Sequence, residues 1–194
     1  MRGISKVDKI KHAGDIGDRM KAYEAAAGTT LNPYYHSVIR ISGRGFKKYC
    51  EGLSSPFDEN IFASMRSATI TFCSEVPGVK LSYIQNDEVT AVIPPSKSLW
   101  YGGRVQKIVS NSATIFADAF NNSIFNKVGR MARFESRTCN LPDDEVNNYL
   151  KWRMLARRQS ASHAVYEGEY AGHFLNGSIV EKTKDGWVCK PYKK

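Results

Sequence analysis

The sequence has little cysteine and no long apolar run, and each shortage excludes a class of protein. Its four cysteines lie far apart, and none falls in a CxxC pair. This spacing argues against a zinc cluster, and so few cysteines in 194 residues argue against a disulfide scaffold. No window approaches the roughly 20 apolar residues of a membrane span, and no charged-then-apolar leader opens the chain. We therefore expect a cytoplasmic protein without a membrane partner.

Acidic residues are also in the minority. The chain has 28 lysines and arginines against 19 aspartates and glutamates, which gives a formal net charge of +9. Hydrophobic residues make up 42% and charged residues 24%, which is typical of a folded protein and excludes wholesale disorder. The positive excess favours a polyanionic partner such as RNA or DNA, although charge alone does not identify one.

Hydrophobic periodicity predicts an alternation of helices and strands. We expect a helix over 18–27 capped by Asp18, a strand over 37–42 and a helix from about 58 to 76. Two strands flank Asn86 and Asp87 as a hairpin, followed by a helix over 104–121 and a strand over 132–137. Three acids after Pro142 begin another helix, and a small hairpin around Asp185 closes the chain.

The order strand, helix, hairpin, helix, strand is the βαββαβ order of a ferredoxin-like α+β fold, an antiparallel sheet with helices on one face. We divide the chain into a basic arm (1–15), a palm-like domain (16–140) and a region with a helix and a C-terminal hairpin (141–194). Polymerase palms and nucleotide cyclases share such a core and place acids at the end of the first strand and on the hairpin. The fold alone does not determine activity.

Two groups of residues near the predicted strand ends are candidates for chemistry. Asp87 and Glu88 offer hard oxygens that could hold Mg²⁺ against a nucleotide's phosphates, or they form a solvated turn. Gly43, Arg44 and Gly45 follow the first strand and could bring backbone N–H groups and a guanidinium to phosphate. The alternative for this glycine pair is an ordinary tight turn.

Two basic groups lie on the predicted helices. Arg104 and Lys107 are three residues apart near a helix start and suit a triphosphate clamp or a solvated face. Arg153, Arg157 and Arg158, near Trp152, suit an RNA backbone or a solvated basic face.

Eight blocks occur in an order that resembles the tRNA(His) guanylyltransferase superfamily, in particular its bacterial and viral-type tRNA 5′-end repair branch. They are GDRMKAYE (17–24), VIRISGRGF (38–46), SSPFDEN (54–60), YIQNDE (83–88), YGGRVQKIVS (101–110), FNN (120–122), RFESR (133–137) and LPDDEVNNYLKWR (141–153). The resemblance implies a palm-like enzyme that adds nucleotides, with GTP preferred and ATP also a substrate, to the 5′ end of a tRNA in the 3′-5′ direction. It also implies two Mg²⁺ ions and a homo-oligomer, either a dimer or a tetramer.

The resemblance also assigns roles to individual residues. Asp87 becomes a metal ligand with Glu88 as its acidic neighbour, and Gly43 offers a backbone carbonyl to a metal. The nucleotide is contacted by a larger set, in which Asp58 faces the guanine edge and Arg104 and Lys107 contact phosphates. This set is Gly43, Arg44, Gly45, Phe46, Asp58, Asn86, Arg104 and Lys107.

The departures from the family pattern lie at the chemistry. Ser42 stands where the family has an aspartate that bridges metals, and a hydroxyl is a poorer Mg²⁺ ligand than a carboxylate. Asn86 replaces a serine, and Glu135 and Ser136 replace the DA of an FDAR block. Two hypotheses follow: an active nucleotidyltransferase with an altered metal site, or a degenerate relative that keeps nucleotide or RNA binding. A third treats Ser42 as an introduced inactivating change.

Overall fold

A computed structural model describes residues 15–54, 58–161 and 177–192, with only the backbone given for 156–161. The predicted basic arm, apart from residue 15, and the side chains of Arg157 and Arg158 therefore lie outside the description. The elements are α1 (Ile16–Ala26), β1 (His36–Gly43), α2 (Phe46–Tyr49), α3 (Glu59–Glu75), β2 (Leu81–Gln85), β3 (Glu88–Ile93), η1 (Trp100–Gly103), α4 (Val105–Val128), β4 (Phe134–Leu141), α5 (Asp143–Ala161), β5 (Ser178–Thr183) and β6 (Gly186–Pro191).

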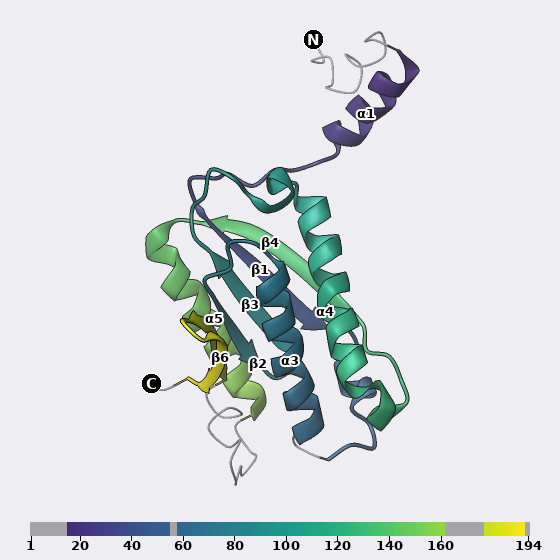
Figure 1. Ribbon diagram of the computed structural model, residues 1–194, viewed down its shortest axis with the longest axis vertical. Helices are drawn as coiled ribbons and strands as arrows, with labels where there is room; N and C mark the ends of the chain where they lie inside the picture. Colours follow the sequence, from purple (N-terminus) through teal and green to yellow (C-terminus); the bar gives the residue numbers. More distant parts are fainter. Residues whose placement is uncertain (1–14, 55–57, 162–176, 193–194) are drawn as a thin grey trace.

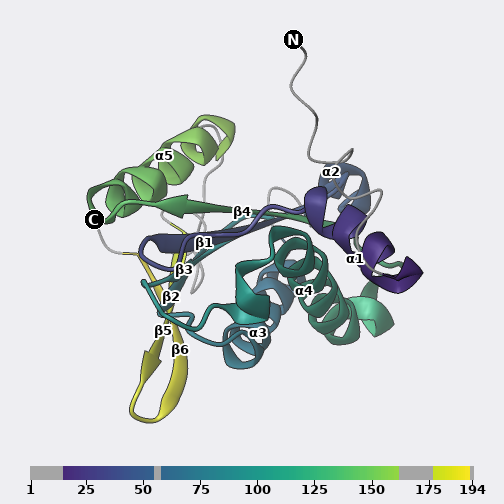
Figure 2. The same ribbon diagram turned by 90° about the horizontal axis from the view of Figure 1, so that it is seen from above.

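The strands form one six-stranded sheet in the order β4-β1-β3-β2-β5-β6, and all neighbours are antiparallel. The first four positions confirm the predicted ferredoxin-like order, because α3 and α4 each carry the chain over one strand. The C-terminal hairpin β5–β6 extends this sheet beside β2. Helices α3 and α4 cover one face, whereas α5 lies over the other (Figure 2). The one-face prediction therefore holds for the βαββαβ core, and α5 adds a third layer.

The period of two along β1 separates the core from a polar face. Ile39 and Ile41 are 1% exposed and belong to the apolar core with α3 and α4. Arg40 and Ser42 alternate with them and therefore point to the face that α5 covers. Helix α3 contributes Met65 and other fully buried side chains at helical spacing, as the sequence predicts.

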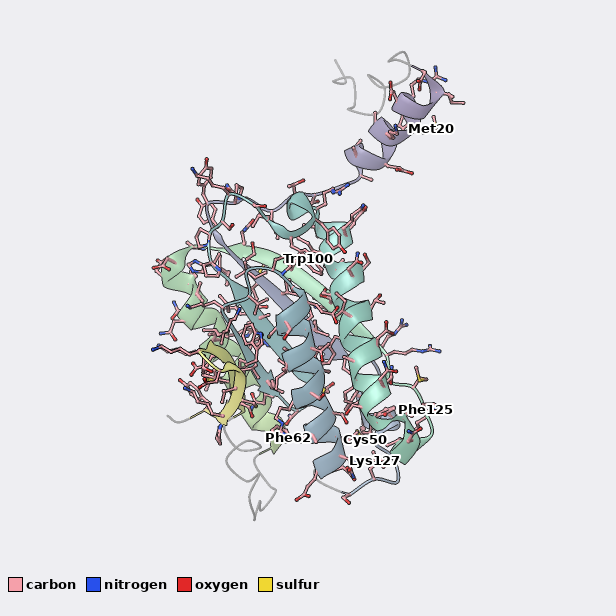
Figure 3. The ribbon with its side chains drawn as sticks, in the orientation of Figure 1. Met20, Cys50, Phe62, Trp100, Phe125 and Lys127 are labelled. Carbon is pink, nitrogen blue, oxygen red and sulfur yellow. The ribbon has the colours of Figure 1, made fainter. Side chains whose placement is uncertain are left out.

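The sheet has two ends, and we name each after a residue. At the Gly43 end, β1 finishes beside the start of β4, with Gly43 opposite Phe134, and beside the start of β3, with Ser42 opposite Glu88. At the Tyr34 end, β1 begins and β3 and β4 finish, with His36 opposite Leu141. Figure 3 shows Cys50 and Lys127 near the first end and Trp100 near the second. Since a strand rises about 3.3 Å per residue, β1 separates the ends by more than about 20 Å.

Helix boundaries differ from the sequence prediction at several points. The N-cap of α1 is Asp15, whose carboxylate accepts a hydrogen bond from the Asp18 amide at 2.8 Å, so Asp18 lies in the first turn and does not cap the helix. Helix α1 buries no residue and projects from the body (Figure 1). Helix α4 continues seven residues beyond the predicted end, to Val128, because Gly129 is the first residue with a left-handed φ. None of the helices in the described ranges is long and apolar enough to cross a membrane.

Candidate functional site

The turn after β1 is fixed between the β2–β3 hairpin and the start of β4. The Gly43 amide donates to the Asp87 carbonyl at 2.9 Å, and the Arg44 amide donates to the Arg133 carbonyl at 2.7 Å. A Cβ on Gly43 would lie 2.3 Å from Cδ2 of Phe46, so only glycine fits. Gly45 has φ 63° and caps the four-residue helix α2. The glycines thus serve a packed turn that brings Arg44 next to the acidic hairpin.

Phe46 is buried in an aromatic cluster, and its place beside a nucleotide stays a prediction. Its side chain is 7% exposed and its ring lies 5.2 Å from that of Tyr49, 5.8 Å from that of Phe120 and 5.8 Å from that of Phe134. The ring therefore contributes packing at the base of the Gly43 turn. The Phe46 side chain packs directly against Gly43.

Asp58 begins helix α3, as predicted, and acts as its N-cap. Its Oδ1 accepts hydrogen bonds from the amides of Asn60 at 2.8 Å and Ile61 at 3.4 Å. Its Oδ2 accepts one from the Ser54 amide at 3.4 Å. The structure thus gives this carboxylate a capping role, and its contact with a guanine edge stays a prediction.

The β2–β3 turn presents Asn86 and Asp87. Asn86 has φ 54°, a conformation that asparagine tolerates better than most residues, and its buried Oδ1 has no hydrogen-bond partner. Asp87 is half-buried close to Cys50, the C-cap residue of α2. Burial, followed by the negative charge of Asp87, raises the pKa of Cys50, so its thiol stays protonated near neutral pH. Cys50 is therefore no nucleophile in this site.

Glu88, the first residue of β3, is occupied by an arginine of α5. Its carboxylate is buried and accepts hydrogen bonds from Nε of Arg153 at 2.6 Å and Nη2 of Arg153 at 2.8 Å. Nε of Arg40 lies 3.7 Å from the same carboxylate. Arg153 is 8% exposed and its guanidinium lies 4.5 Å from the centroid of the Trp152 ring. The expectation of an RNA contact at Arg153 is therefore wrong for this structure, since the sheet buries its guanidinium.

Ser42 lies in a row of carboxylates across the sheet. It is directly opposite Glu88 of β3 and Glu135 of β4, so all three side chains share the α5 face. Glu88 is bound to Arg153, and Glu135 pairs with the exposed Arg137 at 3.1 Å. The register therefore confirms that position 42 adjoins the acidic hairpin, while its two neighbouring carboxylates already have arginine partners.

The structure separates Arg104 and Lys107 from this site. Arg104 precedes α4, and a bridge to Thr30 holds it at the Tyr34 end. The separation of more than about 20 Å exceeds the reach of an arginine or lysine side chain. Within one chain they cannot contact a phosphate that also touches Asp87, contrary to the expectation of one shared triphosphate site.

Two arginines that were not singled out in the sequence, Arg130 and Arg133, lie at the Gly43 end. Arg133 is exposed and its carbonyl accepts the Arg44 amide, so the backbones of two arginines adjoin. Arg130 donates from Nη2 to the Glu51 carbonyl at 2.6 Å, and its Cζ lies 5.5 Å from the Tyr49 ring centroid. The only sequence signal was the density of arginine between α4 and β4.

The metal implied by the resemblance fits these residues only in part. Asp87 and the Gly43 carbonyl are hard oxygen donors that suit Mg²⁺ arriving with a triphosphate, where the ion would neutralise phosphate charge. Ser42 adds no carboxylate, and both oxygens of Glu88 are bound to Arg153. In the part of the chain that the structure describes, no three His, Cys, Asp or Glu side chains gather as a metal site. The donor set therefore suits one ion better than two.

Comparisons with known proteins identify a family for this chain. A family model described as "Thg1: tRNAHis guanylyltransferase" matches residues 17–142. The tRNA(His) guanylyltransferase of Schizosaccharomyces pombe is 30% identical over 135 residues, which cover 64% of this chain and 50% of that protein. The chain spans about half the length of the curated relatives it matches.

Solved structures cover more of the chain. A bacterial tRNA(His) guanylyltransferase (Thg1)-like protein in complex with GTP has a TM-score of 0.83 and 27% identity over 93% of both chains. The ATP complex of a bacterial Thg1-like protein has the same TM-score at 25% identity and the same coverage. The family match, which covers more than half of the sequence, and the shared palm fold lead to one conclusion. This chain belongs to the Thg1 family of tRNAHis guanylyltransferases.

Proposed function

We propose that this chain is a nucleotidyltransferase that adds nucleotides to the 5′ end of a tRNA in the 3′-5′ direction, with GTP preferred over ATP and Mg²⁺ required. In this reaction the 3′-hydroxyl oxygen of the incoming nucleotide attacks an activated 5′ phosphorus. On a tRNA that begins with a 5′-triphosphate, a new P–O bond forms at the α-phosphorus, the bond to the bridging oxygen breaks and pyrophosphate leaves with the electron pair, while the hydroxyl proton passes to solvent.

One observation carries the proposal. The Gly43 turn and the Asp87 turn are joined by a hydrogen bond of 2.9 Å, in a fold that matches a GTP-bound relative with a TM-score of 0.83. In-line attack at phosphorus needs positioning and charge neutralisation more than a side-chain nucleophile. Exposed arginines and one carboxylate at the Gly43 end of the sheet supply both.

The residues of the Gly43 end have different roles in this reaction. Arg44 and Arg133 are exposed and placed to neutralise the triphosphate. Asp87 and the Gly43 carbonyl hold the cation that accompanies it. Glu88 and Arg153 hold the hairpin in place and contact no phosphate.

A second candidate is a protein that binds nucleotide and RNA without turnover. The arginine partners of Glu88 favour it, because the carboxylate nearest to Ser42 in β3 is not available to replace the missing aspartate. This candidate keeps the arginines and Asp87, and so keeps triphosphate binding.

The deciding experiment incubates the purified chain with labelled GTP, Mg²⁺ and a tRNA that lacks its first nucleotide and begins with a 5′-triphosphate. The proposal expects a labelled product one nucleotide longer, which is lost with Asp87→Ala and reduced when GTP is replaced by ATP. No incorporation by a chain that binds GTP, measured by calorimetry, would favour the second candidate. Absence of both activities would exclude both candidates.

A further inference from the structure

Two segments run side by side at the Tyr34 end, far from the proposed catalytic site. The Ser96 amide donates to the Pro33 carbonyl at 3.0 Å, the Leu31 amide to Gly103 at 2.9 Å and the Val105 amide to Thr29 at 2.9 Å. These bonds join the segment before β1 to the segment before α4. None of these three bonds involves α1, so they fix the two segments independently of that helix.

The side chain of Tyr34 points outward from these two segments. Its side chain is 80% exposed, and that of the neighbouring Tyr35 is 45% exposed. The Tyr34 amide donates to Oδ1 of Asn32 at 3.0 Å, while Asn32 and Asn140 of β4 exchange hydrogen bonds of 2.7 and 3.0 Å. The backbone that carries an exposed aromatic side chain is thus fixed before any partner binds, which lowers the entropy cost of binding.

One cation lies beside Tyr34, and others line a separate groove at the start of α4. A hollow of about 260 Å³ beside Tyr34 is lined by Pro33, Pro95, Ser96 and the exposed Lys97. A larger groove of about 470 Å³, next to the start of α4, is lined by Lys21, Arg104 and Lys107, with Glu24 as its acidic member. Exposed aromatic rings among lysines and arginines are the pattern that binds single-stranded nucleic acid, through base stacking and phosphate contacts.

We propose that the Tyr34 surface, defined as Tyr34, Tyr35, Lys97, Arg104 and Lys107, binds unpaired nucleotides of an RNA. The tyrosine rings stack on bases and the cations contact phosphates. A protein partner is less suited, because this patch is basic on a chain of net charge +9 that already favours polyanions. The identity of the RNA as tRNA rests on the proposed function; the binding chemistry does not.

The main test measures binding of a fluorescent 12-nucleotide single-stranded RNA by anisotropy in low salt. Tyr34→Ala should weaken binding about tenfold, or about 1.4 kcal/mol, while Tyr34→Phe, which keeps the ring, should stay within about twofold. Lys97→Ala and Arg104→Ala should each lower the slope of log affinity against log salt by about 1. Lys184→Ala, on the exposed β5–β6 turn, is the matched cation control and should leave the affinity unchanged.

A crosslinking experiment shows which part of the protein contacts the RNA. The same RNA carrying 4-thiouridine should crosslink to a peptide containing Tyr34 or Tyr35. Crosslinks confined to other peptides, or equal losses with Tyr34→Phe and Tyr34→Ala, would overturn the proposal. A change of oligomeric state with Tyr34→Ala and no loss of RNA affinity would instead make this surface a contact between copies. Since the probe carries no tRNA 5′ end and no triphosphate is added, a failed incorporation assay leaves this test intact.

Discussion

At position 42 the strand register surrounds an uncharged side chain with charged ones. Glu88 and Glu135 flank Ser42 on the two neighbouring strands, and Arg40 precedes it on the same face. Glu88 is held in a buried pair with Arg153 and is therefore no free substitute for an aspartate at this position, whereas the pair of Glu135 with Arg137 is exposed and weak. Placing a carboxylate at residue 42 therefore tests directly whether this position limits metal binding.

We predict that Ser42→Asp raises Mg²⁺-dependent nucleotide addition by on the order of 10². A carboxylate opposite the acidic hairpin completes a set of hard ligands, and several kcal/mol of barrier is a reasonable share for a metal ion. GTP affinity should change far less, because the arginines are untouched. Single-turnover incorporation and calorimetry measure the two effects separately.

Two further variants control this prediction. Ser42→Asn has the size of the aspartate without its charge and should give no gain. Asp87→Ala in the Ser42→Asp background should abolish the gain. If the chain with Ser42 already works at a rate that aspartate does not improve, the assignment of this metal site is wrong.

Gly43 is the second residue at which the structure predicts a specific effect of a substitution. Because a Cβ there meets three atoms of the Phe46 side chain within 2.9 Å, two of them in the ring, Gly43→Ala should destabilise the fold by about 1–3 kcal/mol through overpacking. Urea unfolding measures the loss. In the Phe46→Ala background, which lacks Cγ and Cδ2, Gly43→Ala should cost less than in the unchanged chain, and purely additive losses would show that the ring is not the obstacle.

At the scale of elements, α5 is held to the sheet by a buried ion pair. Glu88→Gln leaves Arg153 and Arg40 without their carboxylate, and breaking such a buried pair costs about 3–5 kcal/mol. We expect the apolar pair Glu88→Leu with Arg153→Met to cost less than Glu88→Gln alone, as urea unfolding would show. Equal or larger losses in the double variant would mean that the guanidinium has another essential partner.

The elements themselves were largely predictable because their signals are local. Ile61 and Met65 at helical spacing, and the strands on either side of Asn86, lie where periodicity placed them. Burial of Phe46 and the pairing of Arg153 depend on which faces meet in the folded chain, and no short window contains that information. Arg153 looked like part of an exposed basic run because its partner, Glu88, is 65 residues away.

At the scale of the whole molecule, the two ends of the sheet should act independently within one chain. We predict that Arg104→Ala with Lys107→Ala leaves GTP affinity within about twofold, because more than about 20 Å separates them from Asp87. Arg44→Ala with Arg133→Ala should weaken GTP binding at least about tenfold. Calorimetry with both double variants tests this contrast. A tenfold loss in the first would show that a second copy brings its Tyr34 end to this site.

The strand order also has a kinetic consequence. The β2–β3 and β5–β6 hairpins join neighbours in sequence and can form within about 1–10 μs. Pairing of β1 with β4 must bring together residues such as Ser37 and Asn140, which are 103 positions apart. Closing so long a loop costs chain entropy before the strand contacts can stabilise the structure. Proteins with such long-range pairing therefore fold slowly. The nascent chain must therefore be complete to β4 before its central strand β1 has both neighbours, and to β5 before β2 does.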